Sequence, residues 1–388
     1  MTSLQARHWR SAADALALLR QQAVVTRPQL GRRLGLESGP TSDLVKRVAR
    51  AGLICERPAP TGGRGRPTTT VHAHPSGPLA LVVDLRHGDW RLGTCALDGE
   101  VNVLAVESHD GTQPGAVVAR IRSRLRSAAR RVGDRLIGVG VAVPGPTVED
   151  RFANVTMLGW RDLDLGRLSI PELPLVVAND ATMAAVAEAR LHTPQPRSLL
   201  HLVVEIGIGG ALVIDGRPVA SARGVHGEFG HLPLGPYDET CPCGARGCWT
   251  IPFDPPHIAR RTGLRLRPDP RTQLHRLFTD ECPSEAARGV RQELATSLGR
   301  GTAGLVNALD PDLVTLGGLA FELRAAVPDG FDDAVRSGLM DVHRHPGPRI
   351  VEARSGDDAP LVGAGLSVLD RVVDAAMLAE WAAKRATA

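Results

Sequence analysis

Three cysteines within eight residues are the feature that most constrains this chain. Cys241, Cys243 and Cys248 lie close together with two glycines that allow tight turns, and His231 precedes the first of them by ten residues. One nitrogen and three sulfurs make a closed tetrahedral zinc site that leaves no position for an activated water. We therefore predict a structural zinc ion held by these four residues, in a loop over residues 231–248. A redox role for Cys-Pro-Cys is the alternative, but it leaves His231 unused.

The length of the chain sets its class. With 388 residues it is long enough for two to three domains and for cores that need no disulfides. It has no run of about 18 apolar residues, and no apolar stretch follows the charged N-terminus as in a signal peptide. These observations exclude the membrane and secreted classes and predict a cytoplasmic protein.

Charge divides the chain into two parts. Residues 1–75 hold 12 Lys and Arg against 4 Asp and Glu, whereas the remaining residues hold 34 against 38. A basic head on a mildly acidic body indicates that the head binds a polyanion and that the body binds a different kind of partner.

The head has the pattern of a winged helix-turn-helix. A helix over residues 12–20 is followed by a second over about 28–34, with Thr26 as its N-cap, and by a third over about 38–50. A strand follows. In this motif the last of these helices enters the major groove of DNA. A small helical interaction module is the alternative.

The last of these helices supplies most of the predicted DNA contacts. Short polar side chains early in a recognition helix reach base edges, while arginines hold phosphates. Asp43 would repel phosphate unless it accepts a hydrogen bond from a cytosine amine or pairs with an arginine. The residues expected to face bases are Ser38, Thr41, Ser42 and Lys46, and those expected to hold phosphates are Arg32, Arg33, Arg47 and Arg50.

A run rich in glycine and arginine follows the head. Residues 61–67 read Thr-Gly-Gly-Arg-Gly-Arg-Pro, similar to the Arg-Gly-Arg-Pro core of minor-groove hooks. We expect Arg64 and Arg66 to enter a narrow A·T-rich minor groove, where the negative potential is enhanced. A flexible linker or a wing tip is the alternative. The expected domains are the head over residues 1–60, a linker over 61–77 and the body over 78–388.

The body alternates buried strands with helices, which indicates a two-lobed α/β fold with a cleft. Two sets of strands and helices each open on a strand that a glycine-rich or acidic turn follows. An amphipathic helix over residues 114–132 carries six arginines, which we interpret as a solvated face. Strands are expected at residues 79–85, 90–97, 101–106, 136–143, 175–178, 199–204 and 211–214, with a further helix at 181–191.

Several motifs of the body occur in a specific order. They are Pro144-Gly-Pro146, Asn179-Asp-Ala181, Gly207–Gly210, Gly227-Glu-Phe-Gly-His231, Cys241-Pro-Cys-Gly-Ala-Arg-Gly-Cys248 and Pro311–Gly318. Together with the head, this order resembles the ROK family of repressors, open reading frames and sugar kinases over essentially the whole chain. The resemblance implies an actin-like, ribonuclease H-like body, and the N-terminal winged helix places the chain among the regulators.

The resemblance also implies a ligand site. The family's sugar contacts carry over to Asn179, Asp180, Glu228 and His231, whose polar atoms suit vicinal sugar hydroxyls. His231 would bind zinc through one ring nitrogen and face the ligand with its other edge. Two places after the last cysteine the family's kinases have a glutamate, but this chain has Thr250, so its pocket is altered. The alternative is that Asp180 only caps the helix that follows it.

Two departures from the family predict that the chain is not an enzyme, although Asp180 stands where the kinases keep their catalytic base. Those kinases follow the aspartate of the first strand with Gly-Gly-Thr, whereas residues 84–88 here read Asp-Leu-Arg-His-Gly. Their second phosphate loop, Gly-Thr-Gly, reads Glu-Ile-Gly at residues 205–207. A carboxylate in that loop disfavours a triphosphate, because like charges repel.

These observations predict a DNA-binding transcriptional repressor with a degenerate sugar-kinase body, assembled as a homodimer or homotetramer. Its partners would be a double-stranded DNA operator and a sugar or other small-molecule effector, with zinc as a structural cofactor and no membrane contact. An effector would act through motion between the lobes, by binding one state more tightly than the other. An active sugar kinase with an appended DNA-binding domain, and a regulator blind to ligand, are the alternatives.

Overall fold

The computed structural model describes residues 3–21, 25–58, 69–111, 113–149, 151–265, 269–279 and 282–386. The chain forms two compact units. Both combine helices with a five-stranded sheet, so the predicted α/β class is confirmed. Unit 1 comprises Met1–Val143, Asp164–Ala178 and Leu361–Ala388, and unit 2 comprises Pro144–Leu163 and Asn179–Pro360.

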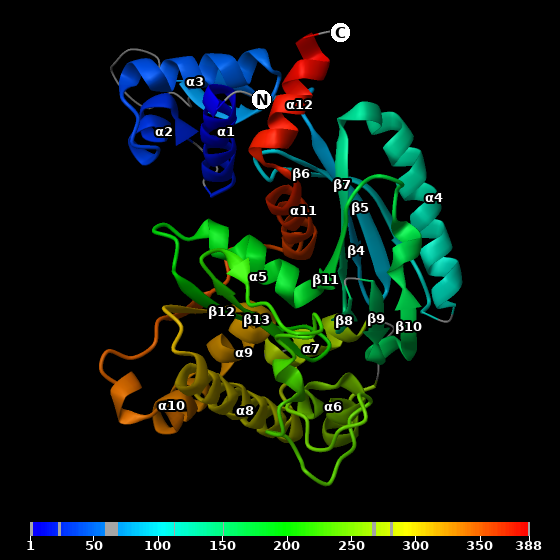
Figure 1. Cartoon of the computed structure of the whole chain (residues 1–388). Coiled ribbons are helices and arrows are strands. Elements are labelled where there is room, and N and C mark those ends of the chain that lie inside the picture. The colour runs from blue at the N-terminus through cyan, green and yellow to red at the C-terminus, as the bar shows by residue number, and fades with distance from the viewer. Residues whose placement is uncertain are drawn as a thin grey trace. The chain divides into compact units, whose positions relative to one another are not determined.

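Unit 1 begins with a winged helix-turn-helix, as predicted (Figure 1). Three short strands pair antiparallel in the order β1-β3-β2 and lie with three helices. The elements are α1 (Ser3–Gln21), β1 (Val25–Thr26), α2 (Arg27–Arg33), α3 (Ser38–Arg50), β2 (Ile54–Pro58) and β3 (Thr69–Ala73).

Local sequence signals set the helix-turn-helix. Thr26 and Gln29 form a capping box at the start of α2, in which the Thr26 N–H donates to Gln29 Oε1 at 2.8 Å. Gly35, with φ at +64°, makes the turn that leads to α3. Leu30 of α2 and Leu44 of α3 are buried in the small core of this head.

The head extends beyond the predicted boundary at residue 60. In β3, Thr69 lies opposite Pro58 and Ala73 lies opposite Ile54, so the second half of the wing begins after residue 68. Part of the predicted linker over residues 61–77 is therefore a strand, held by ladder hydrogen bonds to β2 and β1. The run over residues 61–67 falls between the two wing strands and lies outside the described residues.

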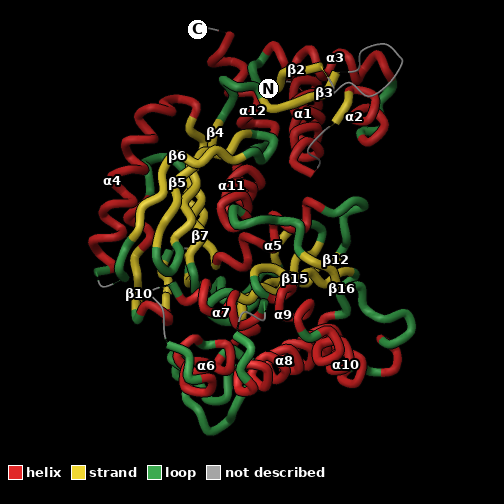
Figure 2. The backbone as a smooth tube through the Cα atoms, turned by 180° about the vertical axis from the view of Figure 1, so that it is seen from behind, coloured by secondary structure: helices red, strands yellow, loops and turns green. Residues whose placement is uncertain are grey.

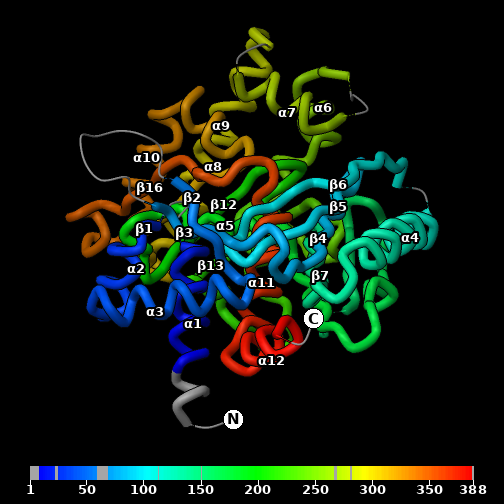
Figure 3. Tube along the Cα trace, turned by 90° about the horizontal axis from the view of Figure 1, so that it is seen from above, coloured from blue at the N-terminus to red at the C-terminus, as the bar shows by residue number. Residues whose placement is uncertain are grey.

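The rest of unit 1 is built on a sheet in the order β11-β7-β4-β5-β6. Strand β4 (Leu79–Leu85) directly follows the head and runs parallel to β7 (Leu136–Val143), and α4 (Pro114–Val132) lies along this sheet (Figure 3). The apolar stripe of α4 is buried. These three elements have the predicted bounds. The others are β5 (Asp89–Ala96), β6 (Val101–Ser108), β11 (Leu175–Asn179), α11 (Ala359–Val372) and α12 (Ala375–Ala386).

The C-terminal helices of unit 1 pack against the head. The indole N–H of Trp381 in α12 donates to the carbonyl of Ala51, the C-cap residue of α3, at 3.0 Å. Arg20 of α1 lies 3.4 Å from the carboxylate of Asp370 in α11. The recognition helix is thus held at its C-terminal end by a residue more than 300 positions further along the chain.

Unit 2 holds the second sheet, in the order β14-β13-β12-β15-β16 (Figure 2). Strand β12 (Ser198–Val204) pairs antiparallel with β13 (Ile208–Ile214) and parallel with β15 (Leu313–Gly318), so the loop after Val204 lies beside Gly318. The other elements are β8 (Thr147–Val148), β9 (Phe152–Val155), β10 (Trp160–Asp164), β14 (Arg217–Pro218), β16 (Ile350–Glu352), α5 (Asp180–Leu191), α6 (Pro255–Thr262), α7 (Pro270–Phe278), α8 (Glu285–Leu309), α9 (Ala320–Ala326) and α10 (Pro328–Gly338).

The core of unit 2 joins the sheet to the long helix α8. Leu200 and Leu202 of β12 belong to one buried cluster with Leu294 and Leu298 of α8. This apolar contact holds the sheet of unit 2 against α8. Across the described ranges, no helix has both the length and the apolar character that a bilayer span requires.

Candidate functional site

Four side chains of unit 2 could hold a metal ion. The donor atoms of His231, Cys241, Cys243 and Cys248 all lie within 4.8 Å of one another. Cys241 Sγ is 3.7 Å from His231 Nδ1, and Cys243 Sγ is 3.6 Å from Cys248 Sγ. The structure therefore brings together all four residues that the sequence spacing predicted, and one imidazole with three thiols is a donor set suited to Zn²⁺.

Glycine turns bring these thiols to one point. Gly244 and Gly247 have φ of +97° and +70°, a region that favours glycine, and the N–H of Cys241 donates to the carbonyl of Ala245 at 2.8 Å. Burial, together with the neighbouring thiols, raises the pKa of Cys248 to about 12. A bound cation would favour the thiolate that this environment otherwise disfavours.

Trp249 anchors the cysteine loop in the core. The residue is fully buried, and its indole N–H donates to Ser297 Oγ of α8 at 3.1 Å. Its backbone N–H donates to the carbonyl of Leu232, just after His231, at 2.8 Å. The cysteine loop and α8 are therefore packed together.

Two of the predicted ligand residues stand at the start of α5. Asn179 is the N-cap residue, and its side chain accepts a hydrogen bond from the N–H of Thr182 at 3.1 Å. Asp180 Oδ1 accepts from the N–H of Ala181 at 2.8 Å. Both residues therefore contribute to the helix terminus, and a sugar contact through their remaining polar atoms stays a prediction.

Glu228 lies between the start of α5 and the cysteine cluster. Its carboxylate is 3.8 Å from His231 Nε2, while Nδ1 of the same ring faces Cys241. Burial, together with the negative charge of Asp180, raises the pKa of Glu228 to about 7. The structure thus places Glu228 and His231 in contact, with Asp180 within electrostatic reach of Glu228.

Thr250 has a structural task in this chain. Its hydroxyl accepts a hydrogen bond from the N–H of Ile208 at 3.1 Å, and its own N–H donates to the carbonyl of Gly230 at 2.8 Å. It also lies against Gly207, where a Cβ would approach its hydroxyl to 2.6 Å. The residue that replaces the expected glutamate therefore ties the glycine-rich loop to the cysteine loop.

An ion-pair cluster occupies the loop that follows β12. Arg271 of α7 lies with its Nε 2.6 Å from Glu205 Oε2 and donates from a terminal nitrogen to Asp357 Oδ1 at 3.1 Å. The two acidic partners outweigh burial and raise the pKa of this guanidinium. Sequence reasoning noticed Glu205 but missed Arg271, because no motif links residues so far apart in the chain.

The first candidate phosphate loop, in unit 1, is a tight turn. Leu85 is fully buried as the last residue of β4. The N–H of Arg86 donates to the carbonyl of Asp89 at 2.9 Å, and the side chains of these two residues lie 3.9 Å apart. This turn joins β4 directly to β5 and contains no glycine-rich loop.

The recognition helix presents most of the predicted DNA contacts to solvent. Arg32 and Arg33 of α2 are exposed, as are Ser38, Lys46 and Arg50 of α3, and Ser42 and Arg47 are partly exposed. The prediction for Thr41 is wrong. Thr41 is buried, and its hydroxyl donates to the carbonyl of Glu37 at 2.7 Å, so its side chain faces the core rather than a base. Arg64 and Arg66 lie outside the described residues.

The sequence profile described as the ROK family matches residues 84–371. This chain belongs to the ROK family. The match covers nearly all of the predicted body and includes both the cysteine loop and the start of α5. The predicted resemblance is therefore confirmed.

Both kinases and regulators occur among the ROK proteins similar to this chain. A glucokinase of Streptomyces coelicolor is 27% identical over 310 residues, which cover 74% of this chain and 96% of the relative. A relative from Caldicellulosiruptor sp. strain Rt8B.4, named as a xylose repressor, is 25% identical over 328 residues, which cover 76% of this chain and 79% of the relative.

A solved structure shares the fold of almost the whole chain. It is a ROK family transcriptional regulator described as a homolog of the E. coli MLC protein, with a TM-score of 0.72 at 21% identity over 98% of this chain and 99% of its own. The predicted arrangement, a winged helix-turn-helix followed by a ROK body, is thereby confirmed as the fold.

Proposed function

We propose that this chain is a DNA-binding transcriptional repressor whose ROK body senses a small molecule. The observation that carries the proposal is the winged helix-turn-helix, joined to a ROK body in one chain. A stand-alone kinase has no use for an exposed basic recognition helix, and the fold of a ROK regulator matches nearly the full length. We propose a homodimer or homotetramer, because two heads can read the two halves of a pseudo-palindromic operator.

Exposed residues of α2 and α3 are the proposed contacts to DNA. Ser38, Ser42 and Lys46 would face base edges, and Arg32, Arg33, Arg47 and Arg50 would hold phosphates. Arg64 and Arg66 would enter the minor groove. Thr41 has no part in this surface, because it is buried.

The cysteine cluster is the proposed structural zinc site. With four protein donors the ion has no open position, so its role would be to hold the loop that carries His231. An effector, a sugar or a related polyol, would bind Asn179, Asp180, Glu228 and the edge of the His231 ring that faces Glu228. The contact between His231 and Glu228 supports a coupling of the metal loop to that ligand.

The proposed body binds ligand without phosphorylating it. Phosphoryl transfer depends on positioning and neutralising the phosphates of the nucleotide. Here the loop after β12 carries Glu205, and its carboxylate holds the nearest cation, Arg271, in an ion pair. A phosphate in this loop would have to break that pair and lie beside a carboxylate.

Isolation of genomic fragments bound by the purified chain tests the DNA-binding proposal. Fragments should share a pseudo-palindromic site, and the double substitution of Lys46 and Arg50 to glutamine should abolish their recovery. A reporter under such a site should be expressed more strongly when the gene for this chain is deleted. Recovery of no fragment above a control protein would reject the proposal.

An active sugar kinase is the second candidate, because glucokinases are among the similar proteins. Incubation with ATP, magnesium and a panel of sugars distinguishes the two. We expect no sugar-dependent release of ADP. Release that disappears in Asp180→Asn would favour the kinase, since this residue stands where the family's kinases keep their base.

A further inference from the structure

Basic side chains gather in unit 1 where α12 ends beside the head. We call this group the flank cluster; its members are Arg130 and Arg131 in the last turn of α4, Arg135 in the 3-10 helix Gly133–Arg135, and Lys384 and Arg385 in the last turn of α12. Arg135 is half-buried and the other four are exposed. The acids at this place are Asp134 and Glu380, and Glu380 lies 2.8 Å from Lys384.

The topology of unit 1 brings these helix ends together. Because β7 runs parallel to β4 with Leu136 beside Leu79, the residues just before β7 lie at the end of the sheet that adjoins the head. Arg135 donates to the carbonyls of Pro75 and Gly77 at 2.7 and 2.9 Å, and Arg385 donates to the carbonyl of Ser76, between them, at 2.8 Å. The ends of α4 and α12 therefore meet on one turn at the base of the head.

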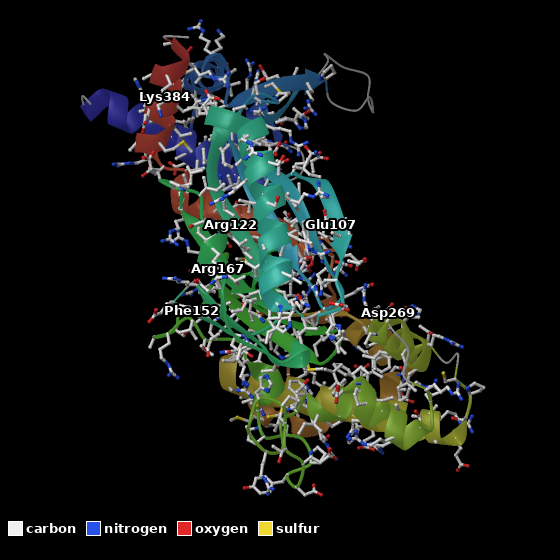
Figure 4. All side chains as sticks on the ribbon, turned by 90° about the vertical axis from the view of Figure 1, so that its right-hand side faces the viewer. Glu107, Arg122, Phe152, Arg167, Asp269 and Lys384 are labelled. Atoms are coloured by element: carbon white, nitrogen blue, oxygen red, sulfur yellow. The ribbon has the colours of Figure 1, made fainter. Side chains whose placement is uncertain are left out.

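Positive charge in the flank cluster is only partly balanced within the described chain. Burial, followed by the charge of Arg385, lowers the pKa of Arg135, as expected for two guanidinium groups placed close together. Among the residues that the structure describes, the side chains of Arg130 and Arg131 have no hydrogen bond or ion pair. Figure 4 shows the end of α12, labelled at Lys384, beside the end of α4. Such a cluster favours a polyanionic partner.

The flank cluster adjoins the C-terminal end of the recognition helix. Trp381, one turn before Arg385, donates to the carbonyl of Ala51 at the end of α3, and the guanidinium of Arg385 lies 4.8 Å from the centre of the Trp381 ring. The predicted phosphate contacts Arg47 and Arg50 occupy the last turn of the same helix. The basic surface of α3 therefore leads toward the flank cluster.

We propose that the flank cluster is a second DNA-contact surface, which binds phosphates of the duplex next to the segment that α3 reads. The proposal rests on the proposed function of the head. A recognition helix of 13 residues is about 20 Å long, whereas one helical turn of the duplex spans about 34 Å. Duplex beyond the end of α3 would therefore meet Lys384 and Arg131 before it leaves the protein.

The test uses the full chain and a fluorescein-labelled 30-base-pair duplex of mixed sequence. Binding is measured by anisotropy between 50 and 200 mM salt. The flank variant is Arg131→Gln with Lys384→Gln, because both side chains are exposed. Loss of two phosphate contacts should lower the slope of log affinity against log salt by about 1.8. The fourfold salt increase should then weaken the flank variant about tenfold less than the unaltered chain.

The matched control removes the same charge elsewhere. Arg217 and Arg300 of unit 2 are exposed and have no ion pair with a described residue, so Arg217→Gln with Arg300→Gln should keep the slope of the unaltered chain. An unaltered slope in the flank variant, or an equal loss in the control, would overturn the proposal and leave an acidic protein as the class of partner. If the unaltered chain binds no duplex at 50 mM salt, the proposed function itself fails, which is a separate result.

Discussion

Gly301 allows the cysteine loop to pack on α8, and its replacement by alanine should loosen that loop. A Cβ at this position would lie 2.0 Å from Cζ2 of Trp249 and 2.4 Å from Cε2 and Cη2. The indole has no room to withdraw, because it is fully buried and bonded to Ser297. Overpacking of this kind costs about 1–3 kcal/mol, and loss of the indole hydrogen bond costs about 1 kcal/mol more. Alanine returns about 1 kcal/mol through its helix propensity, so we expect a net loss of about 1–3 kcal/mol.

Gly304→Ala on the same helix is the matched control. Nothing lies within 4 Å of the Cβ that it would add, so alanine should stabilise α8 by up to about 1 kcal/mol. Urea unfolding followed by tryptophan fluorescence measures both variants, and metal analysis of the purified proteins follows zinc. Because Trp249 comes directly after Cys248, Gly301→Ala should also retain less zinc than the control. Equal unfolding free energies and equal zinc contents would refute the packing argument.

Three further predictions concern buried and capping groups. Burial lowers the pKa of His201 to about 4 from 6.5, so between these pH values the unfolded chain binds more protons than the folded chain, and the unfolding free energy falls as the pH drops. Urea unfolding at pH 7 and pH 4.5 should show that the unfolding free energy falls less in His201→Asn than in the unaltered chain. An identical fall in both would contradict this prediction. Cys248→Ser should lose zinc and have a lower thermal midpoint of unfolding, whereas Cys282→Ser, outside the cluster, should keep both unchanged. Metal analysis measures the zinc content and calorimetry measures the midpoint. Thr26→Ala removes the capping box of α2 and should lower the unfolding free energy by about 1 kcal/mol, as measured by urea unfolding. An unchanged midpoint would show that the cap does not stabilise the fold.

Elements with strong local signals could be predicted from the sequence. The apolar stripe of α4 and its starting proline gave the bounds of that helix, and Thr26 with the following proline marked the start of α2. The strand β3 could not be recognised in this way. Its five residues become a strand only by pairing with β2 and β1, and the glycine- and arginine-rich run before it has the composition of a linker.

The error at Thr41 arose from helix periodicity that was applied incompletely. Thr41, Leu44, Val45 and Val48 stand at positions i, i+3, i+4 and i+7, which lie on one face of a helix, and all four are buried. A short polar residue early in a recognition helix suggests a base contact, but the spacing was the better guide. The four residues of the predicted zinc site do come together in the fold, because they lie close in sequence and the glycines between them allow tight turns.

The ion-pair cluster around Arg271 changes the argument against kinase activity in a way that sequence alone could not reach. From the sequence, Glu205 is a lone carboxylate that repels a triphosphate. In the folded unit its charge is offset by Arg271, 66 positions away, which Asp357 also holds. Because two carboxylates share one guanidinium, the cluster still carries a net negative charge, so Arg271 does not remove the repulsion that Glu205 implies. A second obstacle is that Arg271 is already held in these ion pairs, so a phosphate must displace a carboxylate before it gains any neutralisation.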